Sequence, residues 1–145
     1  MMPEVNTLTE PPLLPRHVFV YGTLRKGDDN DINRLSPRPQ YVGLARVAGQ
    51  MYHLGAYPGV ILGPPHANGD GNQVVVGEVY LIEPELERVL DEIEELYPQQ
   101  TDEYIKREVS VKLPDGRLDC LVYEINPAYV VNKPLIASGD WVKDR

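Results

Sequence analysis

Acidic side chains crowd one segment of this sequence, and carboxylates are among the groups that carry protons in catalysis. The residues from Pro84 to Tyr97 predict a helix, because proline at the first helical position sacrifices no hydrogen bond and Pro98 would end the element. The apolar residues of this segment recur at helical spacing: Leu86, Val89, Leu90, Ile93 and Tyr97. The angle of each carboxylate to this apolar stripe therefore indicates which of them faces the core.

Glu94 is the carboxylate that helical geometry turns most toward the core. At about 100° per residue, Glu94 lies about 80° from the centre of the stripe and Glu87 about 100°. Asp91, Glu92 and Glu95 are expected to point further away. Partial burial raises the pKa of a carboxyl group toward the range that suits proton transfer. Geometry alone nevertheless favours a simpler interpretation, in which Glu94 is a boundary residue with a surface partner.

A second group with chemical potential is the segment Tyr21-Gly22-Thr23-Leu24-Arg25. The run from His17 to Leu24 alternates and is rich in β-branched and aromatic residues, so it predicts a strand that ends at Gly22. A strand that breaks into a loop at glycine exposes successive backbone N–H groups, which can hold a carboxylate or an oxyanion. A functional loop and an ordinary turn are equally compatible with these five residues.

Other kinds of catalytic site have little support. Three histidines occur, without metal-ligand spacing, so no metal is expected: His17, His53 and His66. The sequence has no serine-nucleophile elbow and no P-loop, and no cofactor is expected. The single cysteine, Cys120, lies in an alternating run and is interpreted as a buried strand thiol rather than a reactive one.

The elements that must position these residues are mostly strands. The sequence predicts two short strands around Gly49, an apolar segment at 57–63 that is closed by glycine, and its strongest strand from Gln73 to Ile82. A short helix is expected near Asp31 to Leu35, and Tyr57-Pro58-Gly59 is interpreted as a plain turn rather than a pocket border. Two further strands, 104–113 and 117–125, would form a hairpin around Pro114-Asp115-Gly116. One firm helix without a repeated βαβ pattern favours an α+β fold, a mixed and mostly antiparallel barrel or half-barrel.

Composition limits the class of protein. The chain has 145 residues, 42% of them hydrophobic, which suits one domain with a real core. We expect residues 1–16 to form a flexible tail, which has no signal-peptide character, and residues 17–145 to form a single domain. A formal charge of −8 without a basic cluster argues against nucleic acid as a partner, and no apolar run is long enough to span a membrane. A lone cysteine favours a reducing, cytoplasmic setting, and nothing in the sequence indicates an oligomeric state.

Taken in order, the motifs resemble those of the γ-glutamylcyclotransferase-like family, including its AIG2-like branch. The resemblance begins with Val-Tyr-Gly-Thr-Leu-Arg at Val20 to Arg25 and spans about residues 17 to 142. The further motifs follow in the family's order: Tyr57-Pro58-Gly59, Gly77-Glu78-Val79-Tyr80, Leu90-Asp91-Glu92-Ile93-Glu94, Tyr104 with Arg107 and Val109, and Ser138-Gly139-Asp140-Trp141. The resemblance implies a compact β-barrel flanked by helices, with Glu94 as the catalytic residue and a substrate-binding set. That set is Tyr21, Gly22, Thr23, Leu24 and Tyr104.

The resemblance also implies a reaction on a small-molecule γ-glutamyl amide. The free α-amine would attack its own γ-carbonyl, giving 5-oxoproline and a free amine, with Glu94 as general acid/base and without a metal or cofactor. Three alternatives remain at this point: a binding or regulatory domain on the same fold, an enzyme acting on another amide, and a scaffold that uses the acidic helix. The loops Lys26 to Gln40 and Pro64 to Asn72 would decide the choice of amide.

Overall fold

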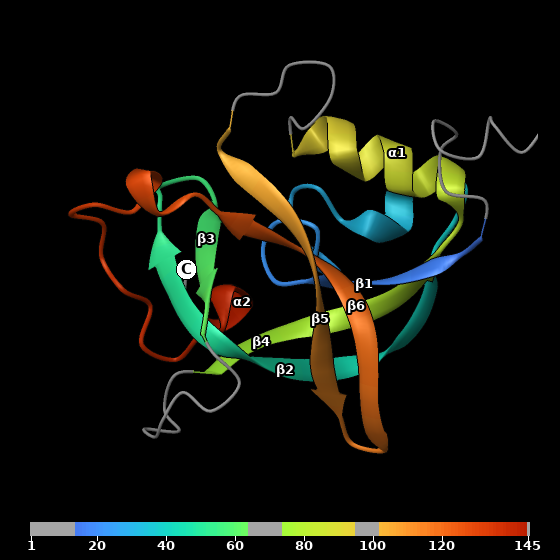
Figure 1. Cartoon of the computed structure of the whole chain (residues 1–145). Helices are drawn as coiled ribbons and strands as arrows, with labels where there is room; N and C mark the ends of the chain where they lie inside the picture. Colours follow the sequence, from blue (N-terminus) through green and yellow to red (C-terminus); the bar gives the residue numbers. More distant parts are fainter. Residues whose placement is uncertain (1–13, 64–73, 95–101, 145) are drawn as a thin grey trace, which may run out of the picture.

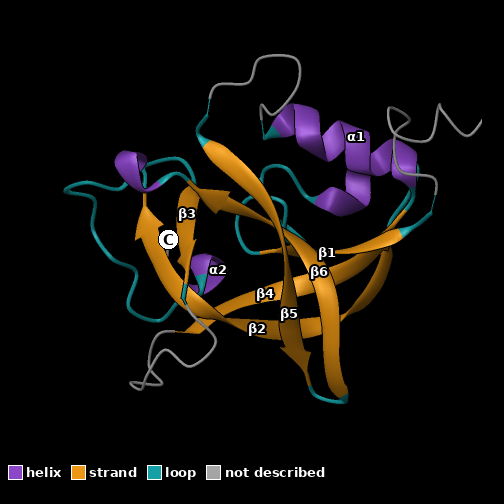
Figure 2. Ribbon diagram, in the orientation of Figure 1, coloured by secondary structure: helices purple, strands orange, loops and turns teal. Residues whose placement is uncertain are grey.

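The structure, a computed structural model, describes residues 14–63, 74–94 and 102–144. Its strands form a curved sheet with one helix packed against it (Figures 1 and 2). The elements in chain order are β1 (Arg16–Val20), a 3₁₀ turn (Ile32–Arg34), β2 (Gln40–His53), β3 (Pro58–Leu62), β4 (Val74–Ile82), α1 (Pro84–Ile93), β5 (Tyr104–Leu113), β6 (Gly116–Ile125), a second 3₁₀ turn (Pro127–Tyr129) and α2 (Trp141–Asp144). Residues 1–13 of the expected tail and the whole loop Pro64 to Asn72, with His66, lie outside the described residues.

The sheet closes into a barrel. Its strand order is β3-β2-β4-β1-β6-β5, and β5 returns to pair with β2 at Lys112 and Arg46. Within the described residues, five strands thus form the barrel, and β3 is an additional strand paired with β2. The neighbours β1 and β6 run parallel, whereas the other pairs are antiparallel. The expected α+β fold with a mixed, mostly antiparallel barrel is confirmed.

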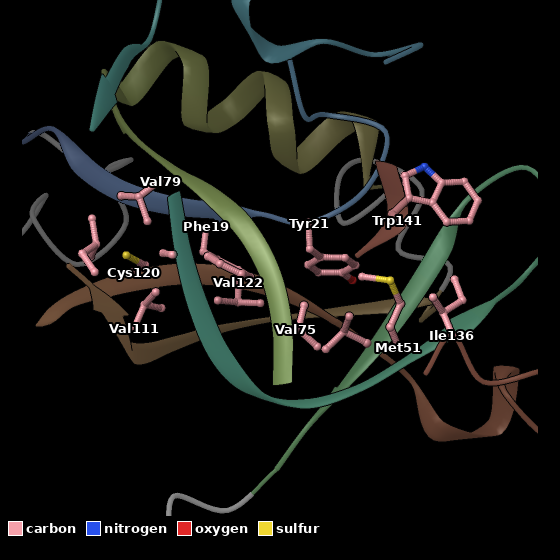
Figure 3. Close-up of a cluster of buried hydrophobic side chains, with 13 residues drawn as sticks. Phe19, Tyr21, Met51, Val75, Val79, Val111, Cys120, Val122, Ile136 and Trp141 are labelled. Carbon is pink, nitrogen blue, oxygen red and sulfur yellow. The ribbon is translucent and has the colours of Figure 1, made fainter. Parts of the chain in front are cut away.

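Two apolar clusters explain why β1 is apolar on both faces. Alternate residues of a strand point to opposite faces of the sheet, and Phe19 belongs to one cluster while Val18 and Val20 belong to the other. The first cluster gathers side chains from several strands and from the C-terminal segment, as Figure 3 shows. The second cluster includes Leu86 and Leu90 of α1. β1 therefore lies between two layers of buried side chains, and the loop that follows it starts from a firmly held point.

The segment from Tyr41 to Gly55 differs from the sequence prediction. It forms one long strand, β2, rather than two short strands around Gly49. Gly49 pairs with Leu62 of β3, and a Cβ atom at Gly49 would lie 2.7 Å from the backbone oxygen of Ile61. The glycine thus allows a close approach of β3 and does not interrupt the strand.

The buried face of α1 also differs from the prediction. Glu87 is 1% exposed and Asp91 6% exposed, whereas Ile93 is 37% exposed. The expectations that Asp91 points away and that Glu94 is the most inward carboxylate are therefore wrong as statements about burial. Glu87 accepts hydrogen bonds from Arg16 of β1 and Lys106 of β5, and these cations make its burial tolerable. The helix ends at Ile93, and Tyr97 and Pro98 lie outside the described residues.

Asp91 belongs to the same charged layer under the helix. It accepts hydrogen bonds from Lys106 and from the hydroxyl group of Tyr123 on β6. Three strands are thereby joined to α1 by polar contacts, since Arg16, Lys106 and Tyr123 lie on β1, β5 and β6. These contacts fix the position of the helix, and with it the position of Glu94 at the helix end.

Cys120 is fully buried in β6, as the sequence predicts. Burial, and then the charges of Asp119 and Glu108, raise the pKa of the Cys120 thiol to about 12. The thiolate is the reactive form, so we expect native protein at pH 8 to resist a thiol-modifying reagent and unfolded protein to react fully. Counting the thiols modified with and without urea checks this prediction, and rapid modification of the native chain would contradict it.

Candidate active site

A pocket of about 260 Å³ opens beside the end of α1. All six site residues expected from the sequence line it: Tyr21, Gly22, Thr23, Leu24, Glu94 and Tyr104. They come from three separate stretches, namely the loop after β1, the C-terminal end of α1 and the first residue of β5. The fold thus brings together residues that lie up to 83 positions apart in the sequence, the separation of Tyr21 and Tyr104 (104 − 21).

Glu94 is the residue that caps the C-terminal end of α1. Its backbone N–H donates to the carbonyl oxygen of Leu90 over 2.9 Å, and its side chain is half-buried. The last turn of a helix packed on three strands is a rigid place for a side chain, because the contacts of Glu87 and Asp91 hold that helix. Glu94 is therefore held at the pocket wall by its element rather than by a mobile loop.

The pocket tyrosines stay protonated at neutral pH. Burial, followed by the negative charge of Glu94, raises the pKa of Tyr21 well above its usual value. The pKa of Tyr104 is raised by burial and by the neighbouring Tyr21 and Glu94. For Tyr123, burial and Asp91 raise the pKa most, with a further contribution from Glu94. The charge of Glu94 therefore acts on all three phenols, and none of them is a base at neutral pH.

The hydroxyl protons of these tyrosines are already used within the protein. Tyr21 donates to the backbone oxygen of Tyr123 over 2.6 Å, and Tyr104 donates to the backbone oxygen of Pro58 over 3.0 Å. Tyr123 donates to Asp91 over 2.7 Å. The tyrosines thus shape the pocket wall, and proton transfer falls to carboxylates.

The loop after β1 folds into a compact turn. The N–H of Arg25 donates to the carbonyl oxygen of Gly22 over 3.0 Å, and the N–H groups of Asn30 and Ile32 donate to Thr23 and Leu24 over 2.9 Å each. The carbonyl oxygens of the loop are therefore occupied. Within the part of the chain that the structure describes, the backbone N–H groups of Gly22, Thr23 and Leu24 donate to no recorded protein acceptor. Donors of this kind can bind a carboxylate or an oxyanion.

The pocket also includes residues outside the six that were predicted as site residues. Glu103 lines it and accepts a hydrogen bond from the hydroxyl group of Tyr57, which also lines it with Pro58. The interpretation of Tyr57-Pro58-Gly59 as a plain turn is therefore wrong, because Pro58 begins β3 and its side chain lies beside Gly22. No local signal marks Glu103, since its partner is 46 residues away.

The pocket is acidic. Three carboxylate residues line it, Asp29, Glu94 and Glu103, and no lysine or arginine occurs among its described lining residues. Like charges in a recess attract a ligand cation and disfavour a ligand anion unless specific donors hold it. This distribution of charge suits a ligand that carries both an ammonium group and a carboxylate. The acidic side chains would attract the ammonium group, and the loop N–H groups would hold the ligand's carboxylate.

Gly22 is expected to tolerate no side chain. A Cβ atom at Gly22 would lie 2.7 and 2.8 Å from two ring carbons of Pro58, and a proline ring cannot rotate away. We expect Gly22→Ala to lower the free energy of unfolding by about 1–3 kcal/mol through overpacking. Urea unfolding measures this loss. Gly43→Ala is the matched control, because its added Cβ would make only an ordinary contact of 3.5 Å with Leu113. Equal stabilities for both variants would contradict the prediction.

The chain matches the sequence profile of a family described as gamma-glutamyl cyclotransferase, AIG2-like, over residues 18–143. It belongs to this family. A protein of Vibrio cholerae named putative gamma-glutamylcyclotransferase is 32% identical over 132 residues, which are 86% of this chain and 93% of the relative. The rat gamma-glutamylaminecyclotransferase is 36% identical over 84 residues, which are 54% of each chain. The resemblance to this family is confirmed, and this cyclotransferase homologue belongs to a family of enzymes.

Solved structures show the same fold. YkqA of Bacillus subtilis superposes with a TM-score of 0.67 at 27% identity, over 90% of this chain and 40% of the longer Bacillus chain. The mouse AIG2-like protein superposes with a TM-score of 0.65 at 23% identity, over 87% of this chain and 88% of the mouse chain. The pocket of this AIG2-like cyclotransferase homologue is therefore built on a barrel that other members share. Within the described residues, no helix is long and apolar enough to cross a membrane, and no group of three or more potential metal ligands occurs.

Proposed function

We propose that this AIG2-like family member is a γ-glutamylcyclotransferase that converts a small γ-glutamyl amide into 5-oxoproline and a free amine. One observation carries the proposal: a single pocket is lined by Glu94 and by the loop Gly22 to Leu24, whose backbone N–H groups have no acceptor among the described residues. The family match and the names of the relatives support the reaction class.

The reaction is an acyl transfer within the substrate. The α-amine nitrogen of the γ-glutamyl group forms a bond to its own γ-carbonyl carbon, and the bond from that carbon to the departing nitrogen breaks. The nucleophile is tethered to its target, so the enzyme gains rate by holding the chain in the folded, reactive conformation. A buried pocket wall of tyrosine rings and prolyl carbons favours such a compact conformation over the extended one in water.

Glu94 would carry the proton in both halves of this reaction. The α-amine is an ammonium ion at neutral pH and must lose a proton before it attacks, and the departing nitrogen must gain one. One carboxylate at the pocket wall can accept the first proton and donate it in the second step. The acidic lining attracts the ammonium ion, which places the proton to be removed near a carboxylate.

The loop Gly22 to Leu24 would bind negative charge on the substrate. Its backbone N–H groups are held in one geometry by the turn bonds of Arg25, Asn30 and Ile32. They can hold the α-carboxylate of the γ-glutamyl group or the oxyanion that develops on the γ-carbonyl oxygen. Tyr104 would form part of the pocket wall as a neutral phenol, because its raised pKa keeps it protonated.

The size of the pocket favours a small substrate. Drug-sized ligands occupy pockets of roughly 300–1,000 Å³, and the volume here is about 260 Å³. Such a pocket suits the γ-glutamyl group itself, with the departing amine at its mouth. The proposal therefore extends to γ-glutamyl amino acids and γ-glutamylamines as a class.

A substrate panel tests the proposal. Purified protein is incubated with γ-glutamyl amino acids and γ-glutamylamines, and 5-oxoproline is followed by mass spectrometry. The α-linked glutamyl isomers are the matched controls, because their γ-carboxylate is free and they have no γ-amide bond from which an amine could be expelled. Release of 5-oxoproline from γ-linked compounds alone supports the proposal. A folded protein that binds these compounds and releases no product would instead be a binding domain on this fold.

A further inference from the structure

Glu78 is a buried charged residue to which the proposed reaction gives no role. It lies on β4 opposite Val20, the last residue of β1, at the point where the chain leaves the sheet for the loop Gly22 to Leu24. The side chains of Glu78 and Arg25 are 9% and 8% exposed, and Arg25 Nε donates to Glu78 Oε2 over 3.0 Å. A buried pair of this kind joins the sheet to the residue that directly follows the loop.

Glu78 also binds the backbone of the loop's continuation. Its Oε1 accepts the backbone N–H of Lys26 over 3.0 Å and the hydroxyl group of Tyr80 over 2.8 Å. Burial raises the pKa of Tyr80, so this phenol stays a donor to Glu78 at neutral pH. Both carboxylate oxygens are therefore engaged, and a carboxylate with three donors around it has one orientation.

The C-terminal segment adds a second carboxylate to the same arginine. Arg25 Nη1 donates to Asp140 Oδ1 over 2.9 Å. This segment is itself fixed to the barrel, because the N–H of Val76 donates to the carbonyl oxygen of Gly139 over 2.8 Å. The neighbouring Trp141 donates from Nε1 to Asp28 Oδ2 over 2.8 Å, further along the same loop. The loop between β1 and β2 and the C-terminal segment are thus joined by two contacts, one between Arg25 and Asp140 and one between Asp28 and Trp141.

We propose that Glu78, Arg25 and Asp140 form an ion triad that positions the backbone N–H groups of Gly22 to Leu24 for substrate binding. The substrate-binding role of the loop rests on the proposed function, whereas the ordering of the loop by the triad does not. Buried ion pairs add little net stability compared with apolar packing. A charged triad at this place therefore has its main effect on loop geometry. The residues of the triad act through the loop and are positioning residues, not catalytic ones.

The replacement Glu78→Gln tests the triad, because glutamine keeps the shape and one oxygen acceptor but removes the charge opposite Arg25. We expect kcat/KM for 5-oxoproline release to fall about tenfold to a hundredfold, since small errors in placement are costly. Loss of one partner of a buried pair also lowers global stability, so we expect amide hydrogen exchange to accelerate more in residues 22–26 than in β1 and β4. Glu85→Gln, at an exposed position of α1, is the matched control and is expected to match the wild type.

A second variant tests the triad in case Glu78→Gln does not fold. Asp140→Asn removes a charge from a side chain that is 23% exposed, so it perturbs the core less. If both residues act through Arg25, the double variant should lose less than the product of the two single losses. Activity within about twofold of the wild type with unchanged loop exchange would overturn the proposal, and so would exchange that accelerates equally in the loop and throughout the barrel. If the wild type releases no 5-oxoproline, the proposed function fails, and loop exchange in the variants still decides whether the triad orders the loop.

Discussion

Glu94→Gln is expected to reduce 5-oxoproline release by about 10²-fold or more, the usual contribution of a general acid/base. Glutamine keeps the size of the side chain and its hydrogen-bonding oxygen, but it cannot exchange a proton at neutral pH. Because Glu94 is half-buried at the helix end, we expect the fold and the substrate KM to change little. Steady-state kinetics on a γ-linked substrate, with 5-oxoproline measured by mass spectrometry, gives kcat and KM separately.

Two further replacements sharpen the assignment of the proton carrier. Glu92→Gln removes an exposed carboxylate from the same helix outside the pocket, so its rate should equal that of the wild type. Glu103→Gln removes another carboxylate of the pocket, the one that is hydrogen-bonded to Tyr57, and we expect a smaller loss than for Glu94→Gln. Full activity in Glu94→Gln with a large loss in Glu103→Gln would transfer the acid/base role to Glu103.

Glu87→Gln is expected to cause a large loss of stability. The side chain of Glu87 is 2% exposed and pairs with Arg16 and Lys106, which are 37% and 23% exposed. Breaking a buried pair costs about 3–5 kcal/mol, and partial hydration of the two cations places the expected loss near the lower end, at about 3 kcal/mol. Urea unfolding should show a lower midpoint with an unchanged slope. Glu85→Gln serves here as the exposed control on the same helix.

The ion pairs of Glu87 also predict how the stability difference between the wild type and Glu87→Gln depends on pH. Burial alone would raise the pKa of Glu87, but hydrogen bonds from Arg16 and Lys106 outweigh it and hold the pKa below its ordinary value. A lowered pKa means that the ionised form is stabilised by folding, so the contribution is complete above the unfolded pKa of about 4.3 and is lost as the pH falls through the folded value. The stability difference between wild type and Glu87→Gln should therefore be constant from pH 5 to 7 and shrink below about pH 4. A difference that persists undiminished at pH 2 would contradict this account.

Local signals in the sequence predicted much of the barrel. The hairpin of β5 and β6, the strand β4 and the start of α1 at Pro84 each depend on residues within a few positions of one another. Gly49 was misread because its role is a long-range one, the close approach of Ile61 in β3. Periodicity within one segment cannot distinguish such a glycine from a turn.

The burial of the carboxylates of α1 was not predicted because it, too, depends on long-range contacts. Helical periodicity treats acidic residues as solvent-facing, and the cation that matters most for Glu87, Arg16, is 71 residues away. Because that charge is paired, the helix can bury its acidic residues Glu87 and Asp91 while Ile93 stays partly exposed. The six expected site residues could be placed because the family motifs include them, whereas the hydrogen bond between Tyr57 and Glu103 is a property of the tertiary structure alone.

An isotope label distinguishes intramolecular attack by the α-amine from hydrolysis by water. A γ-glutamyl amide labelled with ¹⁵N at its α-amine is converted by the wild-type protein in water enriched in ¹⁸O, and the products are identified by mass spectrometry. Cyclisation gives 5-oxoproline that retains the ¹⁵N label and contains no ¹⁸O, together with one equivalent of free amine, and this is the result that we expect. Glutamate carrying ¹⁵N and a solvent-derived ¹⁸O would show hydrolysis by water and would contradict cyclisation.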